Sequence, residues 1–116
     1  MVPTLAPATI PETLMLKGPA DLWRGNQHLG RVAGFLPSKM DGWEQGNLEP
    51  SEEFAGVASL FAKEIALLGH ADRWPEAWED SWVEAQGPGV RLICADGQET
   101  PVDLRIRDFN VEIRRR

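Results

Sequence analysis

The sequence predicts an α+β fold in which an antiparallel sheet of five to six strands packs against two helices, at about 52–68 and 75–86. Two observations carry this prediction. Apolar and alternating runs typical of strands precede residue 37 and follow residue 89, and two segments with helical periodicity lie between them. Because strands and helices do not alternate along the chain, we do not expect a parallel, doubly wound sheet.

Length and composition indicate a single domain. The chain has 116 residues, of which 42% are hydrophobic and 26% are charged, a balance typical of a folded chain. We expect residues 13–116 to form this domain and residues 1–12, which hold three prolines, to form an extended arm. Neither a long apolar stretch nor a secretory signal is recognisable, so we expect a cytoplasmic protein.

The first strands are predicted from apolar runs bounded by turn residues. Residues 13–17 end at a Gly-Pro pair, and residues 20–24 and 27–35 flank a Gly-Asn pair, which favours a two-residue hairpin loop. This loop places Leu22 opposite Leu29 and Trp23 opposite His28. The second strand of the hairpin contains glycine at position 30, which indicates a bulge or a close backbone approach.

The middle of the chain predicts a loop and two helices. Residues 37–50 are rich in glycine and polar side chains, which indicates a loop. Ser51 then stands where an N-cap is expected, and apolar residues recur at helical spacing until Gly69, which suits the position after a helix. Pro75 suits the first position of the second helix.

The second helix carries three tryptophans on one side and four carboxylates on the other. Trp74, Trp78 and Trp82 recur every four residues, which is typical of a helix face that packs against the core. The chain ends in two alternating strands, 102–107 and 111–116, after a β-rich run at 90–95. An even-numbered loop would pair Ile106 with Ile113 and Arg107 with Glu112.

The negative charge is concentrated in the middle of the chain. Residues 41–86 hold eleven acidic and two basic side chains, whereas the net charge of the whole chain is −6. The stripe formed by Glu76, Glu79, Asp80 and Glu84 is either solvated surface or a docking face for a basic protein partner. We do not expect nucleic-acid binding, and we interpret the C-terminal run 114–116 as a solvated, frayed end that could contact an anion locally.

No sequence motif indicates catalysis. The chain lacks a nucleophile elbow, phosphate-binding glycine loops and metalloprotease or paired-cysteine motifs. The single cysteine, Cys94, lies in an apolar run and is expected to be a small core residue. His28 and His70 are explained by packing opposite Trp23 and by proximity to a helix end. We therefore expect no cofactor and no metal site.

Two further surfaces are candidates for binding. Trp43 lies in the glycine-rich loop and could form a pocket for a small ligand with Trp23, His28 and Arg31. On the first helix, a second line of residues lies opposite the main apolar stripe: Gly56, Leu60, Lys63 and Leu67. This line indicates a second contact, made by the other helix, by the N-terminal arm or by a second subunit in a homodimer.

One stretch resembles a recurring pattern in small, uncharacterised bacterial proteins. It consists of Trp43, Gly46, Leu48 and Pro50, in the spacing W-x-x-G-x-[LF]-x-P, followed by a helix that carries phenylalanine and then Leu60-Phe61. The resemblance covers about residues 13–116. It implies a bacterial, intracellular, single-domain protein, and it implies no activity.

These observations together favour a non-enzymatic module that binds a protein partner through the acidic helical face or through loop 37–50. The alternative is a protein or enzyme with a small-ligand pocket between the sheet and the helices, near Trp43. Exposed acidic side chains on one helix face favour the first interpretation, whereas a concave site with convergent polar groups would favour the second.

Overall fold

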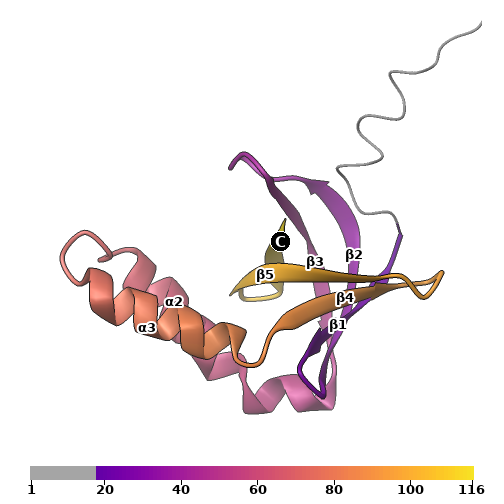
Figure 1. Cartoon of the computed structure of the whole chain (residues 1–116), viewed down its shortest axis with the longest axis horizontal. Coiled ribbons are helices and arrows are strands. Elements are labelled where there is room, and N and C mark those ends of the chain that lie inside the picture. Colours follow the sequence, from indigo (N-terminus) through magenta and orange to yellow (C-terminus); the bar gives the residue numbers. More distant parts are fainter. Residues whose placement is uncertain (1–17) are drawn as a thin grey trace, which may run out of the picture.

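The computed structural model describes residues 18–116 and confirms the α+β class (Figure 1). Six antiparallel strands form a closed barrel: β1 (Ala20–Arg24), β2 (Gln27–Pro37), β3 (Trp43–Pro50), β4 (Val90–Cys94), β5 (Glu99–Arg107) and β6 (Asn110–Arg115). The strand order is β1-β2-β3-β6-β5-β4, so each half of the chain supplies a three-stranded meander. The expected arm at 1–12 and the expected strand at 13–17 lie outside the described residues.

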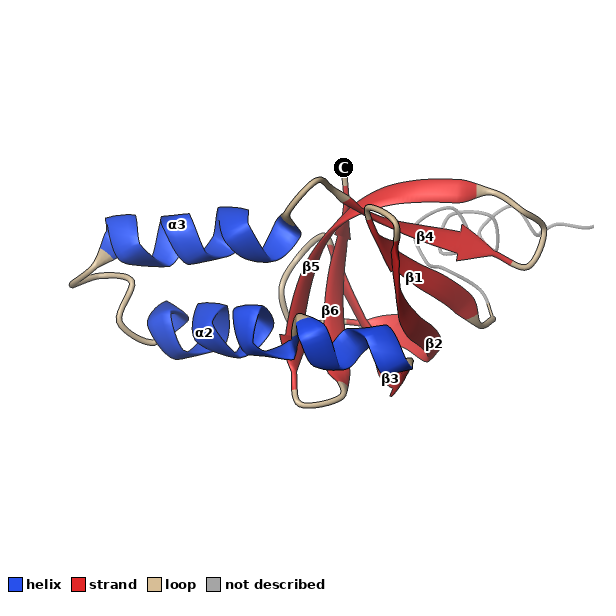
Figure 2. Ribbon diagram, turned by 90° about the horizontal axis from the view of Figure 1, so that it is seen from below, coloured by secondary structure: helices blue, strands red, loops and turns tan. Residues whose placement is uncertain are grey.

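The two meanders are separated by a helical segment that extends away from the barrel. It consists of the 3₁₀ helix η1 (Glu52–Gly56) and the α-helices α2 (Ala58–Leu68) and α3 (Pro75–Gln86). We call α2 and α3 together the helical hairpin, because they run antiparallel and pack on each other (Figure 2). Residues 51–86 contain two basic and eight acidic side chains, whereas residues 18–50 and 87–116 contain nine of each. The barrel is therefore electrically neutral, and the helical segment carries the negative charge.

The interior of the barrel is apolar and comes from alternating strand positions. Leu22, Leu29 and Val32 of the first meander are fully buried, as are Leu104 and Val111 of the second. Alternation therefore correctly indicated the apolar, buried side chains of the last two strands, but in β5 the alternate positions Asp103 and Arg105 are buried as well. The core continues beyond the barrel, because Phe54, Val57 and Phe61 of the helical segment pack against it.

Several sequence-based boundaries and pairings need correction. The predicted loop 37–50 is mostly strand β3, which closes the barrel by pairing with both β2 and β6. The predicted helix 52–68 is interrupted at Val57, whose φ of −123° separates η1 from α2. The three-residue spacing of the buried side chains Phe54 and Val57 matches the tighter period of a 3₁₀ turn. Ser51 precedes η1, but its hydroxyl donates to the His28 carbonyl instead of capping the helix.

The two hairpin registers were predicted in part. Trp23 faces His28 as expected, but a bulge after Leu22 makes that residue face Gly30 instead of Leu29. Gly30 has a φ of +145°, and a Cβ there would lie 2.3 Å from the Glu49 carbonyl oxygen, so the close approach expected at this glycine is confirmed. The β5–β6 loop has an even number of residues, as predicted. With two residues, however, it is shorter than the predicted pairs require.

The short β5–β6 loop shifts each expected pair by two residues without changing the buried face. Ile106 faces Val111, and Leu104 faces Ile113. Arg107 faces Asn110 across the ladder, yet its side chain still reaches Glu112 at 3.4 Å. The shift preserves the alternation because it is an even number of residues.

Candidate functional site

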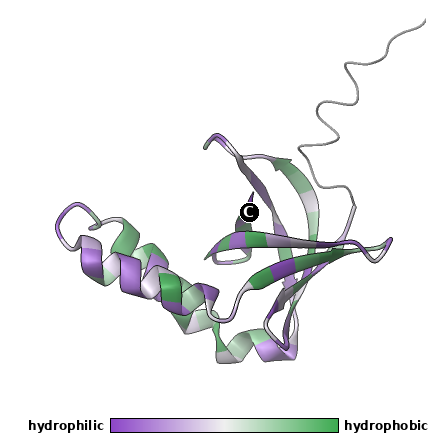
Figure 3. Ribbon diagram, viewed as in Figure 1, coloured by the Kyte–Doolittle hydropathy of each residue, from purple (hydrophilic) through white to green (hydrophobic). Residues whose placement is uncertain are grey.

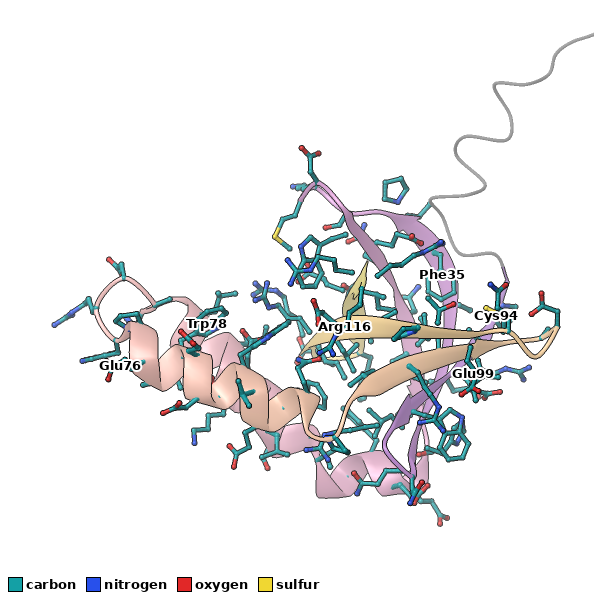
Figure 4. The ribbon with its side chains drawn as sticks, in the orientation of Figure 1. Phe35, Glu76, Trp78, Cys94, Glu99 and Arg116 are labelled. Atoms are coloured by element: carbon teal, nitrogen blue, oxygen red, sulfur yellow. The ribbon has the colours of Figure 1, made fainter. Side chains whose placement is uncertain are left out.

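The outer face of α3 is the acidic surface that the sequence predicted. Glu76, Glu79 and Asp80 are exposed, and within residues 18–116 none of the three forms an ion pair. Glu84 is also exposed but lies 3.7 Å from Lys63 of α2. Figure 3 shows α3 as mainly hydrophilic and α2 as largely hydrophobic, and Figure 4 shows Glu76 near the end of α3 that lies away from the barrel.

An apolar side chain lies within this acidic surface. Val83 is 63% exposed, and helical spacing places it one turn beyond Glu79 and Asp80 on the same face. We define the acidic face of α3 as Glu76, Glu79, Asp80 and Val83. Val83 could not be recognised from the sequence, because a single apolar residue among charges carries no periodic signal.

The helical hairpin is fastened to the barrel by a buried ion pair. Glu64 of α2 is 1% exposed, and its carboxylate accepts two hydrogen bonds from Arg105 of β5, at 3.0 and 3.2 Å. Trp78 of α3 donates its indole N–H to the same carboxylate at 2.6 Å. One carboxylate thus joins α2, α3 and β5, which holds both helices in a fixed orientation.

Aromatic rings extend this connection. The Arg105 guanidinium lies 5.3 Å from the ring centroids of both Trp43 and Trp82. Arg114 lies 4.9 Å from the Trp43 centroid, and Trp78 stacks on Trp82 at 6.1 Å. These cation–π and ring contacts account for two of the three tryptophans on the predicted core-facing side of α3. Trp74 differs from the expectation, because it is 50% exposed and contacts His70 and Arg73 instead of the core.

Two more contacts hold the end of α3. Arg24 of β1 donates to the carbonyl oxygens of Glu84 and Ala85 at 2.9 and 2.8 Å, and cations stabilise this end of a helix. The buried Gln86 side chain bonds both backbone groups of Leu104, at 2.7 and 3.0 Å. It takes the place of a neighbouring strand at Leu104, because β4 begins at Val90, which pairs with Val102, and so does not extend to Leu104.

The C-terminal arginines are exposed, as expected of a solvated end, but they are ion-paired, which corrects the expectation that this end is frayed. Strand β6 continues to Arg115, which lies 3.5 Å from Glu44. Arg114 and Arg116 both bind Asp103, at 2.7 and 2.8 Å, and Figure 4 shows Arg116 beside β5. Burial raises the pKa of the Asp103 carboxyl, but hydrogen bonds from Arg114 and Arg116 outweigh this effect and hold that pKa below its usual value.

The four residues proposed for a small-ligand pocket have separate surroundings. Trp23 packs against His28 at 4.9 Å and against Arg91 at 5.6 Å, while His28 also contacts Asp21 at 3.0 Å. Trp43 belongs to the cluster with Arg105. Arg31 is exposed on β2 and lines a shallow groove beside Pro50. The structure joins Trp23 with His28, but it does not join this pair with Trp43.

The predicted second line on the first helix makes contacts within the chain. Leu60 is half-buried against the core, Leu67 is half-buried, and Lys63 reaches α3 through Glu84. Gly56 is exposed, and a Cβ there would meet open space. The other helix therefore accounts for part of this line, and a second subunit on this face stays a prediction.

Cys94 is half-buried and packs against the core. Burial and the neighbouring Asp96 carboxylate raise the pKa of its thiol, and Arg115 offsets this only in part. A raised pKa keeps the thiol protonated, which disfavours the nucleophilic thiolate. Within residues 18–116, no group of three His, Cys, Asp or Glu side chains is placed to hold a metal ion. None of the helices described there is long and apolar enough to cross a membrane.

No family model, curated protein or solved structure shows significant similarity to this chain. The resemblance to small bacterial proteins consequently stays a prediction, and the function has to be argued from the geometry.

Proposed function

We propose that this protein is a non-enzymatic module that binds a basic protein partner through the acidic face of α3. The observation that carries the proposal is the row of three exposed carboxylates, without ion pairs among the described residues, that precedes the exposed Val83 on one face of α3. Many interfaces combine an apolar contact with a surrounding polar rim that excludes water. Val83 supplies a small apolar anchor, and the carboxylates beside it supply the charge that attracts a basic partner.

The charge distribution supports the same partner chemistry. The barrel is neutral, so the negative potential of the molecule is centred on the helical segment. A localised negative potential accelerates encounter with a basic surface and orients the approaching partner. The partner should therefore present lysines or arginines around a small apolar pocket that accepts a valine side chain.

Contacts on the inner side of α3 also support a binding function, because they hold the helix rigidly against α2 and the barrel. Trp78 and Gln86 tie the inner side of the helix to Glu64 and Leu104, and Arg24 holds its C-terminal carbonyls. A preorganised helix loses little conformational entropy on binding. Partner binding would then involve only the exposed side chains of α3, while its buried side chains maintain the fold.

The two other candidate surfaces gain less support. Loop 37–50 is largely the barrel strand β3, which already pairs with a strand on each side. The Trp43 ring contacts Arg105 and Arg114, and these guanidinium groups are bound to Glu64 and Asp103. No specific observation favours a small-molecule ligand at this ring.

Charge reversal tests the proposal. The triple variant Glu76→Lys/Glu79→Lys/Asp80→Lys should weaken partner binding by about 10- to 100-fold, because each lost exposed pair contributes about 0.2–1 kcal/mol and each new like-charge contact opposes binding. Val83→Asp should weaken binding to a similar degree by removing the apolar anchor. Circular dichroism should show an unchanged fold, since all four side chains are exposed.

A matched variant separates the site from net charge. Asp41→Lys/Glu49→Lys/Glu52→Lys makes the same change in total charge at exposed positions outside α3, two of them in segment 37–50. Binding by this variant should fall by less than about threefold at physiological salt, where long-range charge effects are screened. Equal losses from both triple variants would contradict the proposal, and a loss confined to the second would place the site near Asp41, Glu49 and Glu52.

A further inference from the structure

A second candidate surface lies at the turn between β5 and β6. Phe109 stands at this turn and is 57% exposed. Beside it runs an apolar groove of about 520 Å³ between the turn and the helical segment. The helical wall of the groove consists of apolar side chains from η1 and α2: Phe54, Ala58, Phe61, Ala62 and Ile65. The surface thus combines a projecting aromatic ring with a receiving groove.

We propose that this surface forms a twofold-symmetric dimer, in which Phe109 of each copy enters the groove of the other. A twofold interface uses the same patch on both subunits, so that patch must contain both the projecting group and the site that receives it. The groove is of the size that accommodates small-molecule ligands, so it can take one phenyl ring. An exposed aromatic residue entering an apolar groove is also the usual form of an interface hot spot.

The charges beside the ring are complementary to those of a second copy. Arg107 and Asp108 directly precede Phe109, line the same groove and are both exposed. A twofold axis near Phe109 brings Arg107 towards the partner subunit's Asp108, and the symmetry repeats this contact. Arg107 contacts Glu112 at 3.4 Å through Nε, and Asp108 forms no ion pair within residues 18–116. Arg107 and Asp108 therefore offer one charge of each sign beside the ring, which suits an identical copy better than a strongly charged partner.

The position of the turn also favours a second copy. Figure 2 shows the β5–β6 turn on the side of α2 opposite to α3. Dimerisation at the turn would therefore keep the two acidic faces apart, whereas association through α3 would bring like charges together. A second groove, of about 530 Å³, borders Phe109 on its other side, but Pro19 forms part of its wall, next to the undescribed residues 1–17. We assign the partner's ring to the groove beside α2.

The proposed interface is small, since it consists of two turns and two grooves. Interfaces below about 1,200 Å² are typical of weak complexes, and we expect a dissociation constant on the order of 10–100 μM. Sedimentation velocity of the full chain from about 1 μM to about 1 mM should then show a concentration-dependent shift from monomer to dimer. A wild-type chain that stays monomeric over this range, as it would if residues 1–17 occupied the groove, overturns the proposal.

Two sets of variants identify the surface. Phe109→Asp should raise the dissociation constant by at least about 30-fold, whereas Leu36→Asp, at a residue that is also 57% exposed, should leave it unchanged. Circular dichroism should show that both variants remain folded. Equal effects of the two substitutions would show that association is non-specific and would overturn the assignment.

The charge pair provides an independent test that leaves Phe109 in place. Arg107→Asp should weaken the dimer about tenfold, because it places two carboxylates opposite each other in both symmetry-related contacts. Adding Asp108→Lys should restore dimerisation, since opposite charges then face each other again. Failure of the double variant to recover the wild-type dissociation constant would contradict the twofold arrangement.

Discussion

Replacing Glu64 by glutamine tests how the helical hairpin is held to the barrel. Glu64→Gln keeps the shape of the side chain and can still accept a hydrogen bond from Trp78. It removes the negative charge that faces Arg105, whose own side chain is only 8% exposed. The variant therefore leaves a buried guanidinium without its counter-ion while changing almost no packing volume.

The expected loss can be worked out from the contacts. Removing one partner of a buried ion pair costs about 3–5 kcal/mol, because the remaining charge is neither hydrated nor neutralised. The rings of Trp43 and Trp82 still attract the Arg105 guanidinium, and such cation–π contacts are worth about 0.5–2 kcal/mol. We therefore expect the low end, a loss of about 3 kcal/mol in the free energy of unfolding, or about 12–20 °C in Tm.

Urea unfolding followed by tryptophan fluorescence measures this loss, and calorimetry measures the Tm. Glu84→Gln is the matched control on the same hairpin, because Glu84 is 53% exposed and lies 3.7 Å from Lys63. This control should lose less than about 0.5 kcal/mol. If Glu64→Gln were within about 1 kcal/mol of the wild type, the ion pair would not hold the hairpin and our reasoning would be wrong.

Two further tests concern Asp103 of β5 and Gly87, the glycine that follows α3. Asp103 has a lowered pKa in the folded chain, so its stabilising contribution is present above the unfolded pKa of about 3.9 and is lost as the pH falls through the lower folded value. Asp103→Asn should lower the free energy of unfolding by about 1 kcal/mol at pH 7, a small loss because the arginine partners are half-exposed. It should also reduce the fall in stability at acid pH. An unchanged fall would refute the role of Asp103. Gly87→Ala should cost about 1–3 kcal/mol in urea unfolding, because φ is +57° and the new Cβ would lie 2.5 Å from the Arg24 side chain. Gly56→Ala, which meets open space, should change stability by less than about 1 kcal/mol, and equal effects at the two glycines would contradict the role of Arg24.

Strand alternation and loop parity allowed much of the second meander to be predicted. Within each strand the apolar residues are two positions apart, so any loop with an even number of residues places Leu104, Ile106, Val111 and Ile113 on one buried face. The predicted pairs, Ile106 with Ile113 and Arg107 with Glu112, were wrong because the β5–β6 loop is two residues shorter than those pairs require. In the first hairpin, the bulge beside Leu22 changed the pairing, and Gly30 was its signal in the sequence.

Closure of the barrel could not be predicted, because strand β3 has an unusual composition. Its inward positions include Gly46, where a Cβ would lie 2.8 Å from the Val32 side chain, and the buried Glu44, whose charge is balanced by Arg115. Neither residue is typical of a buried strand, so residues 37–50 were interpreted as a loop. The structure identifies the reason: close packing and a long-range ion pair replace apolar burial in this strand.

The candidate sites were predicted to different degrees. The acidic stripe of α3 follows directly from helical spacing, because exposed carboxylates need no distant partner. The Glu64–Arg105 pair joins residues 41 positions apart and could not be predicted, since Arg105 alternates with apolar residues in the same way as a solvent-facing arginine. Phe109 was placed in a turn, but its groove depends on how α2 packs beside that turn.

The two proposed surfaces would work together in one assembly. A dimer formed through the β5–β6 turn would carry two copies of the acidic face of α3. Two linked sites increase the apparent affinity for a partner that is itself multivalent, without any new contact. Phe109→Asp should then weaken binding to an immobilised, clustered partner while leaving the affinity for a single soluble partner unchanged.

Affinity capture from a cell lysate tests whether the acidic face of α3 binds a basic protein. Tagged wild-type protein, the α3 triple variant and the matched triple variant would be compared side by side, at low and high salt. We predict that wild type and the matched variant capture the same stoichiometric, basic protein, and that the α3 substitutions and high salt each strongly reduce its capture. Retention of that protein by the α3 variant, or recovery of the wild-type bait alone, would contradict the proposed function.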